Sequence, residues 1–122
     1  MPILEVEIVL RPRETLPVDL VGQLADRAAA ALGYQPGGTW VKLRPLPPEQ
    51  YAEGGDGPPE GVYPVFVSVL KADLPQADQL AAEIANLTQA IAQVCDRPPE
   101  SVHILYQRPA RGRIAFGGRL LE

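Results

Sequence analysis

The residues with the clearest capacity for chemistry are Pro2, the single histidine His103 and the single cysteine Cys95. A small residue at position 2 favours removal of Met1, which would leave Pro2 with a free secondary amine. In an apolar pocket or beside cations the protonated form of such an amine is destabilised, so its pKa falls toward neutral. The amine is then a usable general base at physiological pH. Pro2 is therefore the leading catalytic candidate, on the condition that Met1 is removed.

The other reactive residue types form no recognisable site. One histidine and one isolated cysteine give no metal-ligand cluster, and the chain has neither a glycine-rich phosphate loop nor a nucleophile–base pair. Glu5 and Glu7 fall on the same side of an expected strand, and a solvated or interface-facing side is favoured over a paired acid/base site. Cys95 sits late in a helical pattern, where free cysteines are usually buried hydrophobes.

Composition and charge exclude several classes of protein. The 122 residues suit one soluble domain, and the formal net charge is −4. From position 97 onward the chain is locally basic, with the arginines Arg97, Arg108, Arg111, Arg113 and Arg119. Because the chain as a whole is acidic, a broad nucleic-acid-binding face is not expected. These arginines suit subunit contacts or, as a second interpretation, an anion site. No apolar run approaches the ~20 residues of a membrane span, no signal peptide is visible, and the single cysteine fits a reducing compartment, so we expect a cytoplasmic protein.

The first part of the chain predicts a strand, a helix and a second strand. Residues 3–10 alternate apolar and polar side chains with the period of a half-buried strand. Thr15 is expected to cap a helix with Pro17 in its first turn, and Gly33 is expected to end it. Residues 39–44 form the second strand. This order predicts a right-handed β-α-β unit with parallel strands.

The same order recurs after a long proline- and glycine-rich loop. Residues 65–70 predict a third strand, and Asp73, with Gln76 reaching back, is expected to cap a second helix. Residues 101–106 predict a fourth strand. The phrases Val9-Leu10-Arg11 and Val69-Leu70-Lys71 repeat at a spacing of about 60 residues. We therefore expect one domain over residues 1–122, divided into a first half at 2–44, a connecting loop at 45–63, a second half at 64–107 and a C-terminal arm at 108–122.

The order β-α-β-β-α-β is compatible with two α/β (α+β) architectures. One is the ferredoxin-like fold, and the other places two β-α-β halves side by side in a four-stranded sheet with both helices on one face. The order of elements alone does not separate them.

The two ends of the chain favour the second architecture. The tail Arg111-Gly112-Arg113-Ile114-Ala115-Phe116-Gly117-Gly118-Arg119 follows the last strand, and its glycines suggest a β-arm that packs on a neighbour. Together with Pro2-Ile3 at the start of a strand and Pro98-Pro99-Glu100-Ser101-Val102 before the last one, this tail resembles the tautomerase superfamily. The tail is similar to that of 4-oxalocrotonate tautomerase, and the two-half length is similar to that of macrophage migration inhibitory factor.

The resemblance implies a homotrimer with three active sites at subunit boundaries, each built around an N-terminal proline and needing no metal or organic cofactor. By residue, it implies that Pro2 is the proton-transferring amine and that Arg11 or Arg13 binds a substrate carboxylate. It further implies that Lys42 and His103 occupy the positions of other substrate-binding residues. The aromatic ring of the family's tail aligns with Ile114, and Phe116 lies two residues on with the same strand parity.

Two functional hypotheses follow. The first is an isomerase of the tautomerase type that moves a proton on a small 2-keto or enol acid, without nucleic-acid or membrane partners. In a variant of it, Pro2 stays protonated and acts as a general acid in hydration, dehalogenation or decarboxylation of small unsaturated acids. The second is a non-catalytic module, either a tautomerase-fold oligomer or a ferredoxin-like binding domain that uses the connecting loop for recognition.

Overall fold

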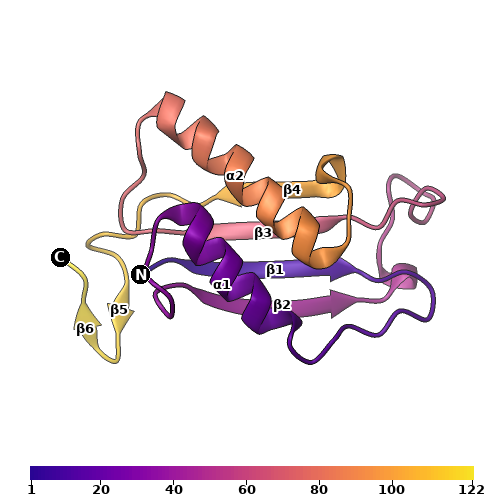
Figure 1. Cartoon of the computed structure of the whole chain (residues 1–122), viewed down its shortest axis with the longest axis horizontal. Coiled ribbons are helices and arrows are strands. Elements are labelled where there is room, and N and C mark those ends of the chain that lie inside the picture. Colours follow the sequence, from indigo (N-terminus) through magenta and orange to yellow (C-terminus); the bar gives the residue numbers. More distant parts are fainter.

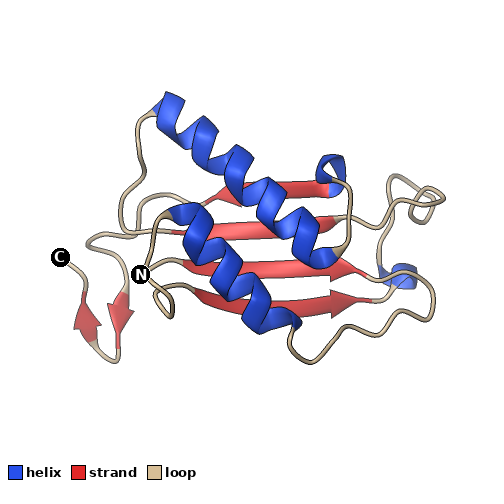
Figure 2. Ribbon diagram, in the orientation of Figure 1, coloured by secondary structure: helices blue, strands red, loops and turns tan.

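The computed structural model describes all residues from 1 to 122. Two helices lie side by side across one face of a four-stranded sheet, and a small hairpin stands apart at one end (Figures 1 and 2). The sheet strands are β1 (Ile3–Val9), β2 (Trp40–Leu46), β3 (Val65–Leu70) and β4 (Val102–Tyr106); the helices are α1 (Leu20–Leu32) and α2 (Ala77–Cys95); the short 3-10 turns are η1 (Pro48–Gln50) and η2 (Pro99–Ser101); the hairpin is β5 (Ala115–Phe116) with β6 (Arg119–Leu120). None of the helices is long and apolar enough to cross a bilayer.

The strand order β2-β1-β3-β4 decides between the two architectures. β1 pairs directly with β2 in parallel, β3 pairs directly with β4 in parallel, and the two halves join through an antiparallel β1–β3 pair. In a ferredoxin-like sheet the β-α-β unit is split, with another strand between its two parallel strands. Here each unit keeps its strands adjacent, so the tandem arrangement is confirmed and the ferredoxin-like alternative is wrong.

The core lies between the sheet and the helices because strand side chains alternate between the two faces. Leu4, Val6 and Ile8 of β1 are almost completely buried on the helix side. They meet α1 through Leu24 and α2 through Leu87, with the valines of β3 completing the layer. The opposite face of the sheet carries the alternate residues and is covered by no element of this chain (Figure 2).

Both helices begin later than their expected caps. α1 starts at Leu20 after Asp19, and α2 starts at Ala77 after Gln76, and neither has a side-chain cap hydrogen bond. The expected caps at Thr15 and Asp73 are therefore wrong. In both segments a leucine precedes a proline, and such a residue is driven out of the helical region. The Asp73 carboxylate accepts hydrogen bonds from Arg111 instead. Gly33 does end α1, in the left-handed conformation at φ 78°.

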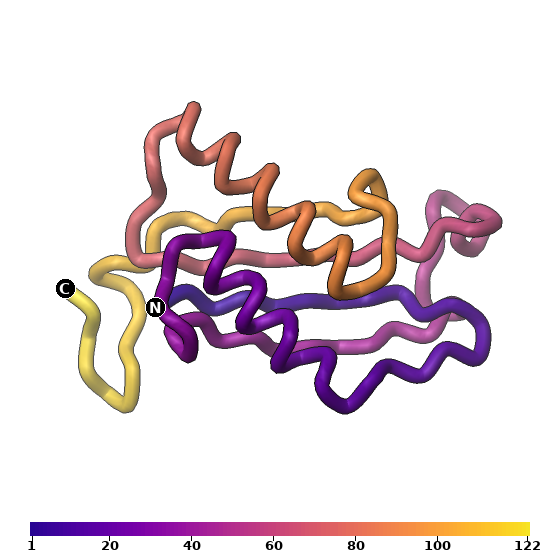
Figure 3. The backbone as a smooth tube through the Cα atoms, viewed as in Figure 1, coloured from indigo at the N-terminus to yellow at the C-terminus, as the bar shows by residue number.

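The sheet has two distinct ends (Figure 3). At the proline end, β1 and β2 begin and β3 and β4 finish. At the loop end, the chain passes through the connecting loop and the segment between β1 and α1. β2 runs through Pro45 and Leu46, which the sequence pattern assigns to the loop; Pro45 is tolerated because β2 is an edge strand.

The C-terminal arm returns to the proline end. Its backbone is held there by Ala110 N–H donating to the Lys71 carbonyl at 2.8 Å. Gly117 and Gly118 form the turn between β5 and β6 with φ values of 58° and 87°, as a two-residue hairpin loop of the primed type requires. The expected hairpin is present, outside the main sheet and beside the N-terminus (Figure 1).

Candidate functional site

Pro2 lies at the proline end with its side chain almost fully buried. Its carbonyl accepts a hydrogen bond from Trp40 N–H at 3.0 Å, and Ile3 pairs with Trp40 on one side and with Leu70 on the other. Thr39 therefore occupies the register position beside Pro2 on the β2 side, and Lys71 occupies the corresponding position on the β3 side. Strand alternation places Pro2 on the face that carries Leu4 and the helices.

Lys71 brings a buried positive charge to this end of the sheet. Its side chain is 7% exposed, and Nζ forms an ion pair with Glu83 Oε1 of α2 at 2.9 Å. The Tyr106 hydroxyl of β4 donates to the other oxygen of Glu83, at 2.5 Å. Lys71 Nζ also lies 5.8 Å from the centre of the Tyr34 ring, within cation–π range. One ammonium, one carboxylate and two phenols thus converge from four parts of the chain, and we call them the Lys71 cluster.

One phenol of the Lys71 cluster has a shifted pKa. Burial raises the pKa of Tyr106, and the hydrogen bond and negative charge of Glu83 raise it further, so this phenol is protonated at neutral pH. Nζ has three N–H donors, but Glu83 Oε1 is its only hydrogen-bond acceptor in the chain. Two of its three N–H groups therefore have no acceptor within the chain.

Lys71 is not among the site residues predicted from the sequence, although a signal for it exists. Lys71 is the repeat counterpart of Arg11, which is among them. The antiparallel pairing of β1 with β3 brings the second copy of the motif, at the end of β3, to the start of β1. The repeat together with that pairing would have placed Lys71, rather than Arg11, at Pro2.

Thr39 is the second residue that sequence reasoning misses. It is 4% exposed, and its Oγ1 is the one buried side-chain oxygen or nitrogen in the chain without a hydrogen-bond partner. Leaving such a group unpaired costs roughly 1–3 kcal/mol. Its place beside Pro2 makes this hydroxyl part of the candidate site.

Arg11 and Arg13 lie at the opposite end of the sheet. β1 lies between the two residues and, at roughly 3.3 Å per residue, keeps Arg11 at least about 20 Å from Pro2 in the same chain. Arg11 donates to Glu14 Oε2 at 3.2 Å and to the Asp96 carbonyl at 2.6 Å. Arg13 is exposed, with a left-handed backbone at φ 64°. One chain therefore does not bring either arginine to Pro2.

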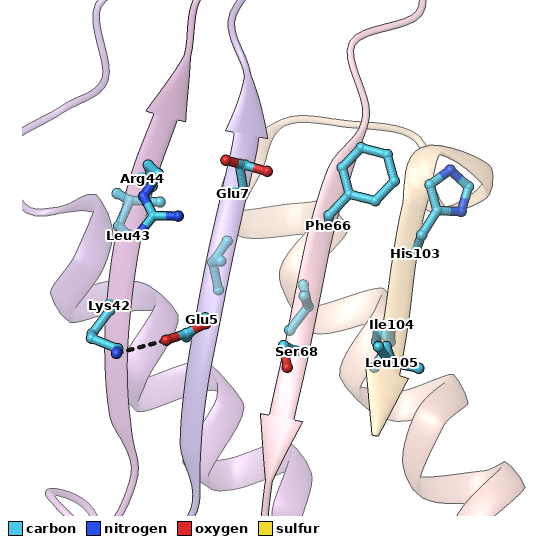
Figure 4. A pocket seen from close by; sticks show the side chains of 12 residues that line it. Glu5, Glu7, Lys42, Leu43, Arg44, Phe66, Ser68, His103, Ile104 and Leu105 are labelled. Atoms are coloured by element: carbon cyan, nitrogen blue, oxygen red, sulfur yellow. Dashed lines mark ion pairs between the residues drawn. The ribbon is translucent and has the colours of Figure 1, made fainter. Parts of the chain in front are cut away.

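Lys42 and His103 lie on the uncovered face of the sheet, on its two edge strands (Figure 4). They line a trough of about 360 Å³ together with Glu5, Glu7, Arg44, Phe66, Ser68 and Leu105. Lys42 Nζ pairs with Glu5 Oε1 at 2.6 Å and lowers the pKa of that carboxyl. The His103 ring lies 5.4 Å from that of Phe66. Three strand spacings, roughly 14 Å, separate the strands of Lys42 and His103.

This trough does not contain Pro2. The Pro2 side chain belongs to the helix side of the sheet, whereas Lys42 and His103 belong to the other side. Within one chain these three residues are not assembled into one pocket.

Phe116 is the predicted arm residue that approaches the proline end most directly. Its ring packs edge-to-face on Trp40, with centroids 5.4 Å apart and planes at 85°. Trp40 is the residue whose N–H holds the Pro2 carbonyl. Ile114 helps to close the arm, since its carbonyl accepts the Leu121 N–H at 2.9 Å.

Cys95 is buried, and burial raises the pKa of its thiol to about 11. The thiol is therefore protonated and unreactive at neutral pH, in agreement with its expected role as a small hydrophobe. No three histidine, cysteine, aspartate or glutamate side chains gather in a way that would hold a metal ion.

Comparison by sequence finds no matching protein-family model and no matching curated protein. Comparison of structures does find proteins of similar fold. A fused 4-OT, solved as an asymmetric trimer, superposes with a TM-score of 0.76 over 98% of this chain and 95% of its own, at 22% identity. Pt0534 inactivated by 2-oxo-3-pentynoate gives 0.75 over 98% and 96%, at 18% identity. The macrophage migration inhibitory factor of Oncomelania hupensis gives 0.73 over 100% and 83%, at 18% identity.

The chain has the tautomerase-like fold. The match extends over nearly the whole chain, arm included, and it agrees with the resemblance drawn from Pro2 and the tail. At these identities the similarity shows the tautomerase-like fold and not the chemistry.

Proposed function

We propose that this protein is a tautomerase-type isomerase that moves a proton on a small 2-keto or enol acid, with Pro2 as the general base. The observation that carries the proposal is the row Thr39–Pro2–Lys71 at the proline end. The row combines a buried proline at position 2 with a buried ammonium within a tautomerase-like fold. The reaction uses Pro2 as a free amine, so it requires removal of Met1.

The low-dielectric setting disfavours the protonated amine and therefore lowers the pKa of a free Pro2 toward neutral. Pro2 takes a proton from the enol hydroxyl of the substrate and returns a proton to carbon, and no net electron transfer occurs. The ammonium of Lys71 binds the substrate carboxylate with its uncommitted N–H groups. We therefore propose Lys71 as the carboxylate cation of the same chain, because Arg11 and Arg13 would reach Pro2 only from another copy.

The proposed assembly is a homotrimer, as in the fused 4-OT structures described as trimers. The uncovered sheet face supports association between copies, since Leu105 is 68% exposed there and Trp40 is 46% exposed. Lys42, His103 and Phe116 would then contribute to sites at the boundaries between copies. We propose a cytoplasmic enzyme that acts on small carboxylates without nucleic-acid or membrane partners.

The decisive experiment combines intact mass spectrometry with an ultraviolet assay of ketonisation on small enol acids. The expected mass lacks Met1, and Pro2→Ala is expected to lose about 100-fold or more in kcat/KM. Pro12→Ala is the matched control, because Pro12 is an exposed proline outside the row. 2-Oxo-3-pentynoate, the compound named with Pt0534, serves as a probe that should add one equivalent to Pro2 of the processed protein.

Lys71 is tested by Lys71→Met combined with Glu83→Gln, so that no carboxylate is left buried without its partner. A rise in KM of about 10-fold or more, with a smaller change in kcat, is expected for loss of a carboxylate contact. Retention of Met1 in the native protein, or equal rates for wild type and Pro2→Ala, would contradict the isomerase proposal and favour a non-catalytic tautomerase-fold oligomer.

A further inference from the structure

Thr39 Oγ1 needs an explanation because buried hydroxyls in folded proteins almost always have a partner. The residue is 4% exposed, and no donor or acceptor of this chain meets the hydroxyl. Its isolation is not a general feature of the fold, since every other buried side-chain oxygen and nitrogen is hydrogen-bonded.

The register brings Thr39 next to Pro2. Trp40 pairs with Ile3 in parallel strands, so the residue before each of them occupies the next position toward the N-terminus. Trp40 is 46% exposed, and alternation places the Thr39 side chain on the opposite, helix-covered face, together with Pro2. Neighbouring strands lie about 4.8 Å apart, so a side-chain oxygen on one strand is within hydrogen-bond reach of the next backbone.

The Pro2 nitrogen also points toward the β2 side, where Thr39 lies. Within a strand the nitrogen and the carbonyl of one residue point to the same side, and the Pro2 carbonyl points to β2, where it accepts the Trp40 N–H. While Met1 is attached, this nitrogen is a tertiary amide with no N–H and no free lone pair. It can then neither donate a hydrogen bond to the Thr39 hydroxyl nor accept one from it. Without Met1 it is a secondary amine, which accepts a hydrogen bond when neutral and donates when protonated.

We infer that Thr39 is a positioning residue for the Pro2 amine, and that its hydroxyl gains its partner only when Met1 is removed. The inference rests on the proposed role of Pro2. The hydroxyl both donates and accepts, so it pairs with the amine in either protonation state and fixes the orientation of the nitrogen. The bond to the charged amine is the stronger of the two, so Thr39 raises the pKa of Pro2 and opposes the effect of burial.

Other charged groups lie at the same end of the sheet. From β3, α2, β4 and the end of α1 these are the members of the Lys71 cluster, and from the arm they are Arg111 with its partner Asp73, and Arg113. The Lys71 ammonium is balanced by Glu83, and Arg111 by Asp73. Substitution of the uncharged Thr39 leaves all of these charges in place, so any change in the titration of Pro2 reports the hydroxyl itself.

The test uses Thr39→Val, which keeps the shape and removes the hydroxyl, and Thr39→Ser, which keeps the hydroxyl. Processed protein labelled with ¹⁵N-proline is titrated by NMR, and the pH dependence of alkylation of Pro2 by 3-bromopyruvate is followed by intact mass. We expect the pKa of Pro2 to be lower by about 0.5 to 1 in Thr39→Val and unchanged in Thr39→Ser. Thr88→Val in α2 is the matched control and should leave the pKa of Pro2 unchanged.

The thermal midpoint separates this role from a structural one. If the hydroxyl has no role, the thermal midpoint of Thr39→Val is expected to equal or exceed that of wild type, and the titration of Pro2 is expected to be unchanged. That result overturns the inference. If Pro2 is free and alkylated but its pKa is the same in Thr39→Val, only the inference fails. If Met1 is retained and Pro2 is never alkylated, the proposed function fails together with it.

Discussion

At the scale of single residues, the two ends of the sheet use buried charge differently. At the loop end, the Arg97 side chain is 1% exposed and makes five hydrogen bonds, to the Tyr63, Cys95 and Val9 carbonyls and to both oxygens of Glu14. These bonds use the N–H groups of all three guanidinium nitrogens, so this cluster is structural. At the proline end, Lys71 and Thr39 keep unused hydrogen-bonding capacity, and this distinguishes a candidate site from a structural one.

Glu14 yields a prediction about stability and pH. Burial works to raise the pKa of its carboxyl, but hydrogen bonds from the Arg97 side chain and the Arg11 backbone outweigh burial and hold the pKa below its ordinary value of 4.5. Because the pKa is lower in the folded state, Glu14 contributes stability that is fully present above about pH 4.5 and is lost as the pH falls through the folded pKa. Glu14→Gln is expected to lower the free energy of unfolding by about 3 kcal/mol at pH 7, with the difference from wild type shrinking below pH 4.5.

Urea unfolding at a series of pH values measures this effect. Glu5→Gln is the matched control: the Glu5–Lys42 pair is half exposed or more on both sides, so its loss should cost less than about 1 kcal/mol. Equal losses for the two variants would contradict the structural role given to Glu14 and Arg97.

At the scale of elements, the arm depends on its glycine turn. Gly118 has φ 87°, a conformation that an L-residue adopts at a cost of about 1 kcal/mol. Gly22 lies inside α1, and a methyl group added there would have no atom within 4 Å. The same substitution is therefore expected to act in opposite directions at the two sites.

Gly22→Ala should raise the free energy of unfolding by about 0.5–1 kcal/mol, because alanine favours the helix. Gly118→Ala should instead loosen the arm, and the Leu121 amide, which donates to the Ile114 carbonyl, should exchange several-fold faster with deuterium. Unchanged protection of Leu121 in Gly118→Ala would show that contacts such as Phe116–Trp40, and not the turn, hold the arm.

At the scale of the whole molecule, the sheet is covered on one face only. Leu105 is exposed on the uncovered face, where it lines the trough of Figure 4, and Val18 is exposed just before α1. If copies associate through the uncovered face, as the proposed trimer requires, Leu105→Lys should shift the mass measured by light scattering toward the monomer. Val18→Lys introduces the same charge elsewhere and should leave the trimer intact; a monomeric wild type would contradict the assembly.

The sequence by itself determined the type and order of the elements, because hydrophobic period, prolines and glycines act over a few residues. The strand at residues 65–70, the end of α1 at Gly33 and the burial of Cys95 all follow from such local signals. The expected cap of α2 did not follow, because the Asp73 carboxylate binds Arg111, which is 38 positions away in the sequence. A local capping preference is not realised where a residue distant in the sequence binds the same carboxylate.

Only the tertiary structure decided which residues meet. Strand pairing separates Pro2 from Arg11 by the length of β1, puts Lys42 and His103 on the other face of the sheet, and brings Lys71 and Thr39 beside Pro2. Register and the direction of strands depend on pairing between distant segments, and the local hydrophobic pattern does not specify that pairing. The sequence therefore identified Pro2 as the candidate, and the pairing of β1 with β2 and β3 determined that Thr39 and Lys71 lie beside it.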